Sequence, residues 1–215
     1  MSEPADDSAL LREQLKRDPE SVLAAAFTRE RARLWRMVQF RLDPIVAARV
    51  DADDVLQDAW IAAAQRVTYF IEHESLSMFV WLRLIVDQAI VNLHRHHLGA
   101  EMRDAHREVS INRPAAAISS SASIAARLVG QMTPPSQVAM RHELAQQLEK
   151  AIEGMDPIDR EVLALRHFEE LTNSEVAEVL EIEQKAASIR YVRAITRLKA
   201  ILQALPGHDG GAGNG

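Results

Sequence analysis

Residues 172–198 of this 215-residue chain read TNSEVAEVLEIEQKAASIRYVRAITRL, and they show the clearest structural pattern in the sequence. Thr172 and Glu175 form a capping box, in which the threonine caps a helix and the glutamate reaches back to it. Apolar residues then dominate 176–180, residues 181–183 make a short turn, and a long helix is expected from Gln184 to about Leu202. A capped short helix, a tight turn and a second helix together predict a helix-turn-helix.

The second helix of this motif is expected to have two different faces. The inner face should consist of Ala187, Tyr191, Ala194 and Leu198. The outer face should carry Lys185, Ser188, Ile189, Val192 and Arg193. Such a face suits the major groove of DNA, where Arg or Lys bonds guanine and Ser or apolar side chains meet other base edges. Arg190 and Arg197 lie toward the flanks, where phosphate contacts are expected. The alternative is a helical hairpin with a solvated basic face.

Charge is distributed unevenly along the chain, whose formal net charge is −6. Residues 184–203 contain five Arg or Lys and no acid, whereas residues 141–183 contain twelve acids and four Arg or Lys. A second basic stretch, 29–41, holds five Arg and one Glu. This uneven distribution of charge suits a chain that binds a polyanion through a basic element and another protein through a different element.

Several classes of protein are disfavoured. The chain has no cysteine, which excludes disulfides and thiolate chemistry and fits a cytoplasmic location. The acidic start does not resemble a signal peptide, and the longest apolar run, Met78–Leu82, is too short to span a bilayer, so no membrane insertion is expected. His94, His96, His97 and His106 lack a further ligand of suitable spacing, so we expect no metal site. We also expect no catalytic site and no cofactor.

Helical patterning and composition predict an all-α chain with two small helical domains joined by a linker. Residues 1–20 are expected to be a polar tail, 21–100 an N-terminal helical bundle, and 141–205 the helix-turn-helix domain. The segment 101–140 is rich in Ser and Ala and is expected to be a linker, with a transient helix around Ile124 to Val129. Residues 206–215 are rich in Gly and are expected to be a disordered tail.

Two separated stretches resemble the sigma-70 family of RNA polymerase sigma factors. Residues 155–180 resemble the start of its fourth conserved region, and 186–198 resemble the helix that reads the −35 element. Upstream, the segment Asp53-Asp-Val-Leu-Gln-Asp-Ala-Trp60 resembles the second-region helix that docks on the polymerase clamp. Since no large domain separates the two regions, the resemblance points to the extracytoplasmic-function (ECF) group. Departures from the family pattern occur at Gln88, Asn92, Glu181, Glu183, Ser188 and Ile189.

The resemblance implies two partners, core RNA polymerase and promoter DNA, with an anti-sigma factor as a further candidate. The stripe expected to hold the core enzyme is Asp54, Gln57, Asp58 and Ile61, which also share one helical face by spacing. The residues expected at the melted −10 strand are Phe70, Ile71, Glu72, His73, Ser77, Trp81, Asn92 and Arg95. Those expected at the −35 duplex are Lys185, Ser188, Ile189, Arg190, Val192, Arg193 and Arg197.

Simpler interpretations stay open for both halves. The acidic stripe can be a solvated helix face, and the aromatic residues between Tyr69 and Trp81 can form a small core. For the whole chain, the rivals are a helix-turn-helix regulator that acts without polymerase and a helical adaptor that binds only protein.

Overall fold

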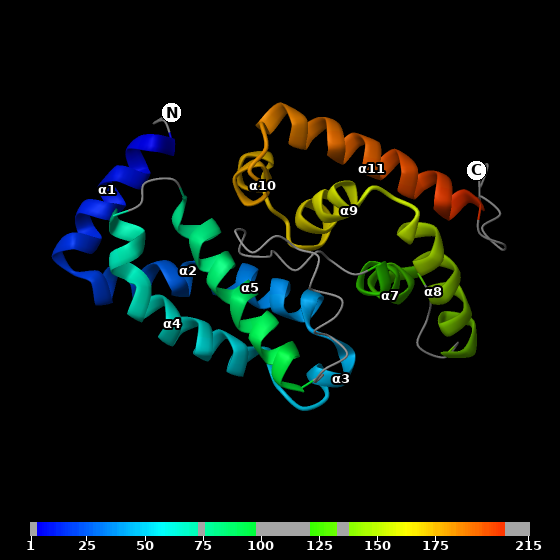
Figure 1. Cartoon of the computed structure of the whole chain (residues 1–215), viewed down its shortest axis with the longest axis horizontal. Coiled ribbons are helices and arrows are strands. Elements are labelled where there is room, and N and C mark those ends of the chain that lie inside the picture. Colours follow the sequence, from blue (N-terminus) through cyan, green and yellow to red (C-terminus); the bar gives the residue numbers. More distant parts are fainter. Residues whose placement is uncertain (1–3, 73–75, 98–120, 133–137, 205–215) are drawn as a thin grey trace, which may run out of the picture. The chain divides into compact units, whose positions relative to one another are not determined.

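The computed structural model describes residues 4–72, 76–97, 121–132 and 138–204, which form helices and contain no strand. The chain divides into two compact units, the first with helices α1 to α5 and the second with helices α7 to α11 (Figure 1). The prediction of an all-α fold is therefore confirmed over the described residues.

Prolines and aspartates set the helix boundaries of the N-terminal unit. After α1 (Pro4–Arg17), the Asp18 carboxylate accepts a hydrogen bond from the Ser21 N–H and caps α2 (Pro19–Arg41). Helix α2 ends just before Asp43-Pro44, because Pro44 cannot continue it, and the short α3 (Pro44–Ala47) follows. Helix α4 (Ala52–Glu72) begins after Asp51, and α5 (Met78–His97) begins after Ser77.

The core of this unit lies where α2, α4 and α5 pack against one another. Leu34 and Val38 of α2, Ala59 of α4, and Leu82 and Val86 of α5 are fully buried there. Burying such side chains is the main source of stability in a domain of this size. The structure also buries a charged pair, Arg41 and Asp87, whose side-chain nitrogen and oxygen are 3.8 Å apart.

Helix α1 lies within the segment expected to be a tail, and its inner face is packed. Leu15 is fully buried, and Arg12 is 6% exposed. The Arg12 guanidinium donates a hydrogen bond to the Leu76 carbonyl at 2.7 Å and lies 4.7 Å from the centre of the Phe70 ring. The sequence did not predict this helix, because most of its residues are polar. Only one leucine and one arginine are buried, which is too few to give a clear apolar stripe.

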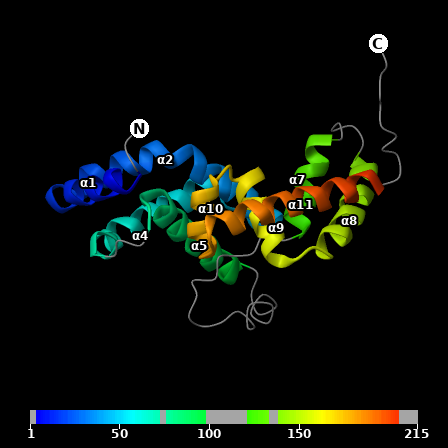
Figure 2. The same ribbon diagram turned by 90° about the horizontal axis from the view of Figure 1, so that it is seen from above.

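The C-terminal unit begins with α7 (Ser121–Met132), inside the segment expected to be a linker. Helix α7 packs along α8 (Val138–Glu153), and both views show the two side by side (Figures 1 and 2). Ile124, Leu128 and Val129 are buried, which explains why the Ser/Ala-rich stretch is helical. The helix predicted around Ile124 to Val129 is therefore longer than expected and has a hydrophobic face in contact with its neighbour.

The remaining helices of this unit are α9 (Pro157–Leu163), a π-helical turn η1 (Ala164–Phe168), α10 (Asn173–Leu180) and α11 (Gln184–Ala204). Asp156 caps α9 by accepting hydrogen bonds from the N–H groups of Ile158 and Asp159, and Pro157 takes the first helical position. Helix α11 packs on α9 and contacts α8. Helix α9 thus packs against the inner side of α11, the helix expected to read DNA.

Candidate nucleic-acid interface

The predicted capping box of the helix-turn-helix is present. The Glu175 N–H donates to the Thr172 hydroxyl at 3.2 Å, and the Thr172 N–H donates to the Glu175 carboxylate at 2.7 Å. Helix α10 is joined to α11 by a turn in which Glu181 adopts a left-handed conformation with φ 53°. The Asn173 side-chain amide donates to the Ser188 hydroxyl at 2.8 Å, which fixes α10 against α11.

The two predicted faces of α11 are largely confirmed. Ala187, Ala194 and Leu198 are buried, and Tyr191 is half-buried beneath the guanidinium of Arg166. On the opposite side, the exposed residues include Lys185, Ile189, Val192, Arg193, Thr196, Arg197 and Lys199. Ser188 is half-buried, because its hydroxyl bonds Asn173 and the Gln184 carbonyl.

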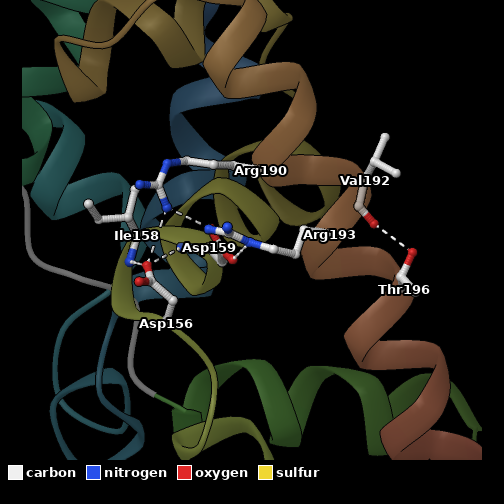
Figure 3. Close-up of polar contacts among 7 residues, drawn as sticks. All are labelled: Asp156, Ile158, Asp159, Arg190, Val192, Arg193 and Thr196. Atoms are coloured by element: carbon white, nitrogen blue, oxygen red, sulfur yellow. Dashed lines mark hydrogen bonds and ion pairs between the residues drawn. The ribbon is translucent and has the colours of Figure 1, made fainter.

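Arg193 is the main difference between the predicted face and the structure. Instead of extending with the outer residues, its guanidinium forms a two-pronged ion pair with Asp159 of α9, with Nη2 at 2.6 Å from Oδ1 (Figure 3). Arg190 donates to the same Oδ1 at 2.8 Å and lies 3.4 Å from Asp156. Both arginines therefore hold α11 to α9, and Asp159, which is 4% exposed, is the shared anchor.

The electrostatics of this cluster favour the ionised pair. Burial opposes the charge on Asp159, but hydrogen bonds from Arg193 and Arg190 outweigh it and lower the pKa of the carboxyl below its ordinary value. The same hydrogen bond raises the pKa of the Arg193 guanidinium. The sequence did not single out Asp159 because its partners are 31 and 34 residues away along the chain.

The stripe expected to hold the core enzyme lies on one exposed face of α4. Asp54, Gln57, Asp58 and Ile61 are all exposed, while Val55, Leu56, Ala59 and Ala63 of the same helix are buried. Ile61 is 48% exposed, so the stripe presents one large apolar side chain beside its acidic ones. Asp54 also has a local role, because its carboxylate accepts a hydrogen bond from the Asp51 N–H at the start of the helix.

The residues expected at the −10 strand are not in equivalent environments. Phe70 and Trp81 are buried, with ring centres 4.8 Å apart, so these two form core in this structure and are not displayed for stacking with bases. Glu72, Asn92 and Arg95 are exposed, whereas Ile71 and Ser77 are half-buried. His73 lies outside the described residues. Sequence reasoning missed Arg12 of α1, whose guanidinium donates a hydrogen bond to the Leu76 carbonyl next to Ser77.

No group of three metal-binding side chains occurs among the described residues. His94 accepts a hydrogen bond through Nε2 from the Asp43 N–H at 3.1 Å. This bond links α5 to the residues that follow α2. None of the described helices is both long enough and apolar enough to cross a membrane.

A capped helix-turn-helix at the end of an all-α chain, with an acid-free second helix, is typical of DNA-binding proteins of transcription. The family comparison is more specific, because residues 145–198 match the model of Sigma-70, region 4. This match lies where the sequence resemblance to the fourth conserved region of sigma-70 factors predicted it.

Among solved structures, a similar fold occurs in CnrH, which was solved in complex with the cytosolic domain of CnrY. The TM-score is 0.51 at 22% identity, and the alignment covers 92% of this chain and 97% of CnrH. This likeness shows that the fold extends beyond the region-4 match. No curated protein matches the sequence.

Proposed function

We propose that this protein is an ECF-group sigma factor that binds core RNA polymerase through α4 and directs it to promoters, with α11 reading the −35 duplex. The observation that carries the proposal is the capped helix-turn-helix, whose exposed second helix has five basic residues and no acid. It lies inside the stretch that matches region 4. The chain itself needs no catalytic group, since the polymerase supplies the chemistry.

The exposed stripe on α4 supports the polymerase contact. Asp58 and Ile61 project from the face opposite the core, so neither is needed to hold the N-terminal unit together. A negative charge beside an apolar side chain suits a partner helix that offers Arg and Leu. At the −10 strand, we propose contacts from the exposed residues Glu72, Asn92 and Arg95 and from the half-buried Ile71 and Ser77.

An anti-sigma factor is the proposed regulatory partner. It is supported by CnrH, which has this fold and was solved with the cytosolic domain of a second protein. A protein that covered the α4 stripe or α11 would compete with polymerase or with DNA.

The polymerase contact can be tested by retention of core RNA polymerase on the tagged full chain. The test variant is Asp58→Arg/Ile61→Asp, because Asp54 is left in place to cap α4. A hot-spot charge or apolar anchor typically contributes about 2 kcal/mol or more, so retention should weaken about 30-fold or more.

Glu20→Arg is the matched control, because it also reverses an exposed acid of the N-terminal unit but lies on α2. Its retention should equal that of the wild type. If the double variant keeps its helical circular dichroism and still retains polymerase normally, α4 is not the docking surface.

A further inference from the structure

Helix α11 presents an apolar centre within a basic outer surface. Residues 185, 189, 192, 196 and 199 follow each other at spacings of three and four, which puts them on one stripe of the helix. Lys185 and Lys199 lie at its two ends. Between them, Ile189 is 58% exposed and Val192 is 64% exposed, the latter the highest value among the large exposed apolar residues described.

The polar groups nearest to this apolar pair are already engaged inside the protein. Arg190 and Arg193 extend to Asp159, and Figure 3 shows Val192 on the opposite side of the helix from both arginines. The Ser188 hydroxyl bonds the Gln184 carbonyl, and the Thr196 hydroxyl bonds the Val192 carbonyl at 2.8 Å. The centre of the stripe therefore offers methyl groups and few free hydrogen-bonding groups.

We propose that Ile189 and Val192 read thymine, by contact with its C5-methyl group in the major groove of the −35 element. Thymine is the base that displays a methyl group in that groove, so an apolar side chain there favours it. This inference rests on the proposed function, because it assumes that α11 enters promoter DNA.

The charges around this face favour DNA over a protein as its occupant. The apolar pair is bracketed by Lys185 and Lys199, and Arg197 is exposed beside it. No acid occurs anywhere on α11, although the preceding residues of the unit are rich in acids. A polyanion whose groove contains apolar methyl groups complements both properties.

The test uses the full chain with core RNA polymerase and a random-sequence duplex library prepared twice, once with thymine and once with uracil in its place. Uracil keeps every hydrogen-bonding group of thymine and lacks only the methyl. Bound duplexes are recovered and sequenced. In the thymine library, the wild type should favour thymine at one or two positions of the −35 element.

The effect expected at each such position is about three- to fivefold, the value of burying one methyl group. That preference should disappear in the uracil library, and it should also disappear with Ile189→Ala/Val192→Ala in the thymine library. Ile158→Ala is the control, because Ile158 is an exposed isoleucine of the same unit that lies on α9. It should keep the wild-type preference.

The possible outcomes separate this inference from the function on which it rests. If the selected −35 sequence is the same in both libraries, or is unchanged in the double variant, methyl recognition is overturned and the sigma-factor function stands. If neither library yields sequence-specific retention with polymerase, the proposed function fails and the inference fails with it.

Discussion

A single buried carboxylate, Asp159, organises the side of α11 that faces α9. It accepts hydrogen bonds from Arg190 and Arg193, which the sequence predicted would contact phosphates and bases. Helical spacing predicted most of the inner and outer residues of α11 correctly, although Ser188 and Tyr191 are both half-buried. It could not predict where a long, flexible side chain on the border between two faces finds its partner, since that depends on α9.

Replacing this carboxylate should weaken the C-terminal unit. Asp159→Asn leaves a side chain of the same shape but removes the charge that both guanidiniums meet, and we expect a loss of about 1–2 kcal/mol in the free energy of unfolding at pH 7. The exposure of Arg193 keeps the expected loss below that of a fully buried pair. Urea denaturation followed by circular dichroism measures it.

The difference in the free energy of unfolding between the wild type and Asp159→Asn should decrease as the pH falls. Because the pKa of Asp159 is lower in the folded protein than in the unfolded chain, its contribution is complete above the unfolded value of about 3.9. The contribution is lost as the pH falls through the folded pKa. The two stability curves should therefore converge in acid. Glu183→Gln, an exposed acid of the same unit, should change stability by less than about 0.5 kcal/mol, and an equal loss there would refute the anchoring role.

At the scale of elements, the turn of the helix-turn-helix carries a local strain. The sequence already showed Glu181 where the family usually has Gly, and the structure gives this residue a φ of 53°. A non-glycine residue in the left-handed region costs roughly 1–2 kcal/mol, because Cβ crowds the backbone. Glu181→Gly should thus raise the free energy of unfolding by about 1 kcal/mol, as measured by thermal or urea denaturation.

Glu183→Gly is the matched control for this prediction. It lies two residues later in the same turn, and its φ is not positive. Glycine there relieves no left-handed strain. Its entropy cost opposes its favourable place just before α11, so stability should change by less than about 0.5 kcal/mol. Equal effects from both substitutions would show that the conformation of the turn carries no strain.

Other elements show how far the sequence could predict the fold. The ends of α2 and the starts of α4 and α9 were predictable, because Pro and capping Asp act locally. Helix α1 was not predicted, and α7 was predicted to be shorter than it is. Each has only a few buried residues, and those are buried by neighbouring helices that the local sequence does not indicate. The π-helical turn η1, where Arg166 bonds the Leu171 carbonyl, has no local signal that would have predicted it.

At the scale of the whole molecule, charge opposes DNA binding by the free chain. The net charge is −6, and the unit that contains α11 also contains the acid-rich stretch 141–183. Its acids lie within a few Debye lengths of α11, about 8 Å each at physiological salt, so part of their repulsion survives screening. Two of the five basic residues of α11 are also paired with Asp159, which leaves few charges to displace counterions from DNA.

Binding to polymerase would change this balance. Docking would hold the two DNA-binding surfaces of the chain in register and turn two weak contacts into one bivalent contact. We therefore expect that the complex with polymerase binds DNA sequence-specifically and that the free chain does not. A helix-turn-helix regulator that acts without polymerase would behave in the opposite way.

Fluorescence titration of one duplex tests this most directly. The duplex is selected from the random library by the chain with core RNA polymerase, and it is titrated with the chain alone and with the complex, at two salt concentrations. We expect the chain alone to bind the duplex weakly, with a shallow salt dependence, and the complex to bind it tightly and sequence-specifically. Tight, sequence-specific binding by the chain alone at physiological salt would contradict it.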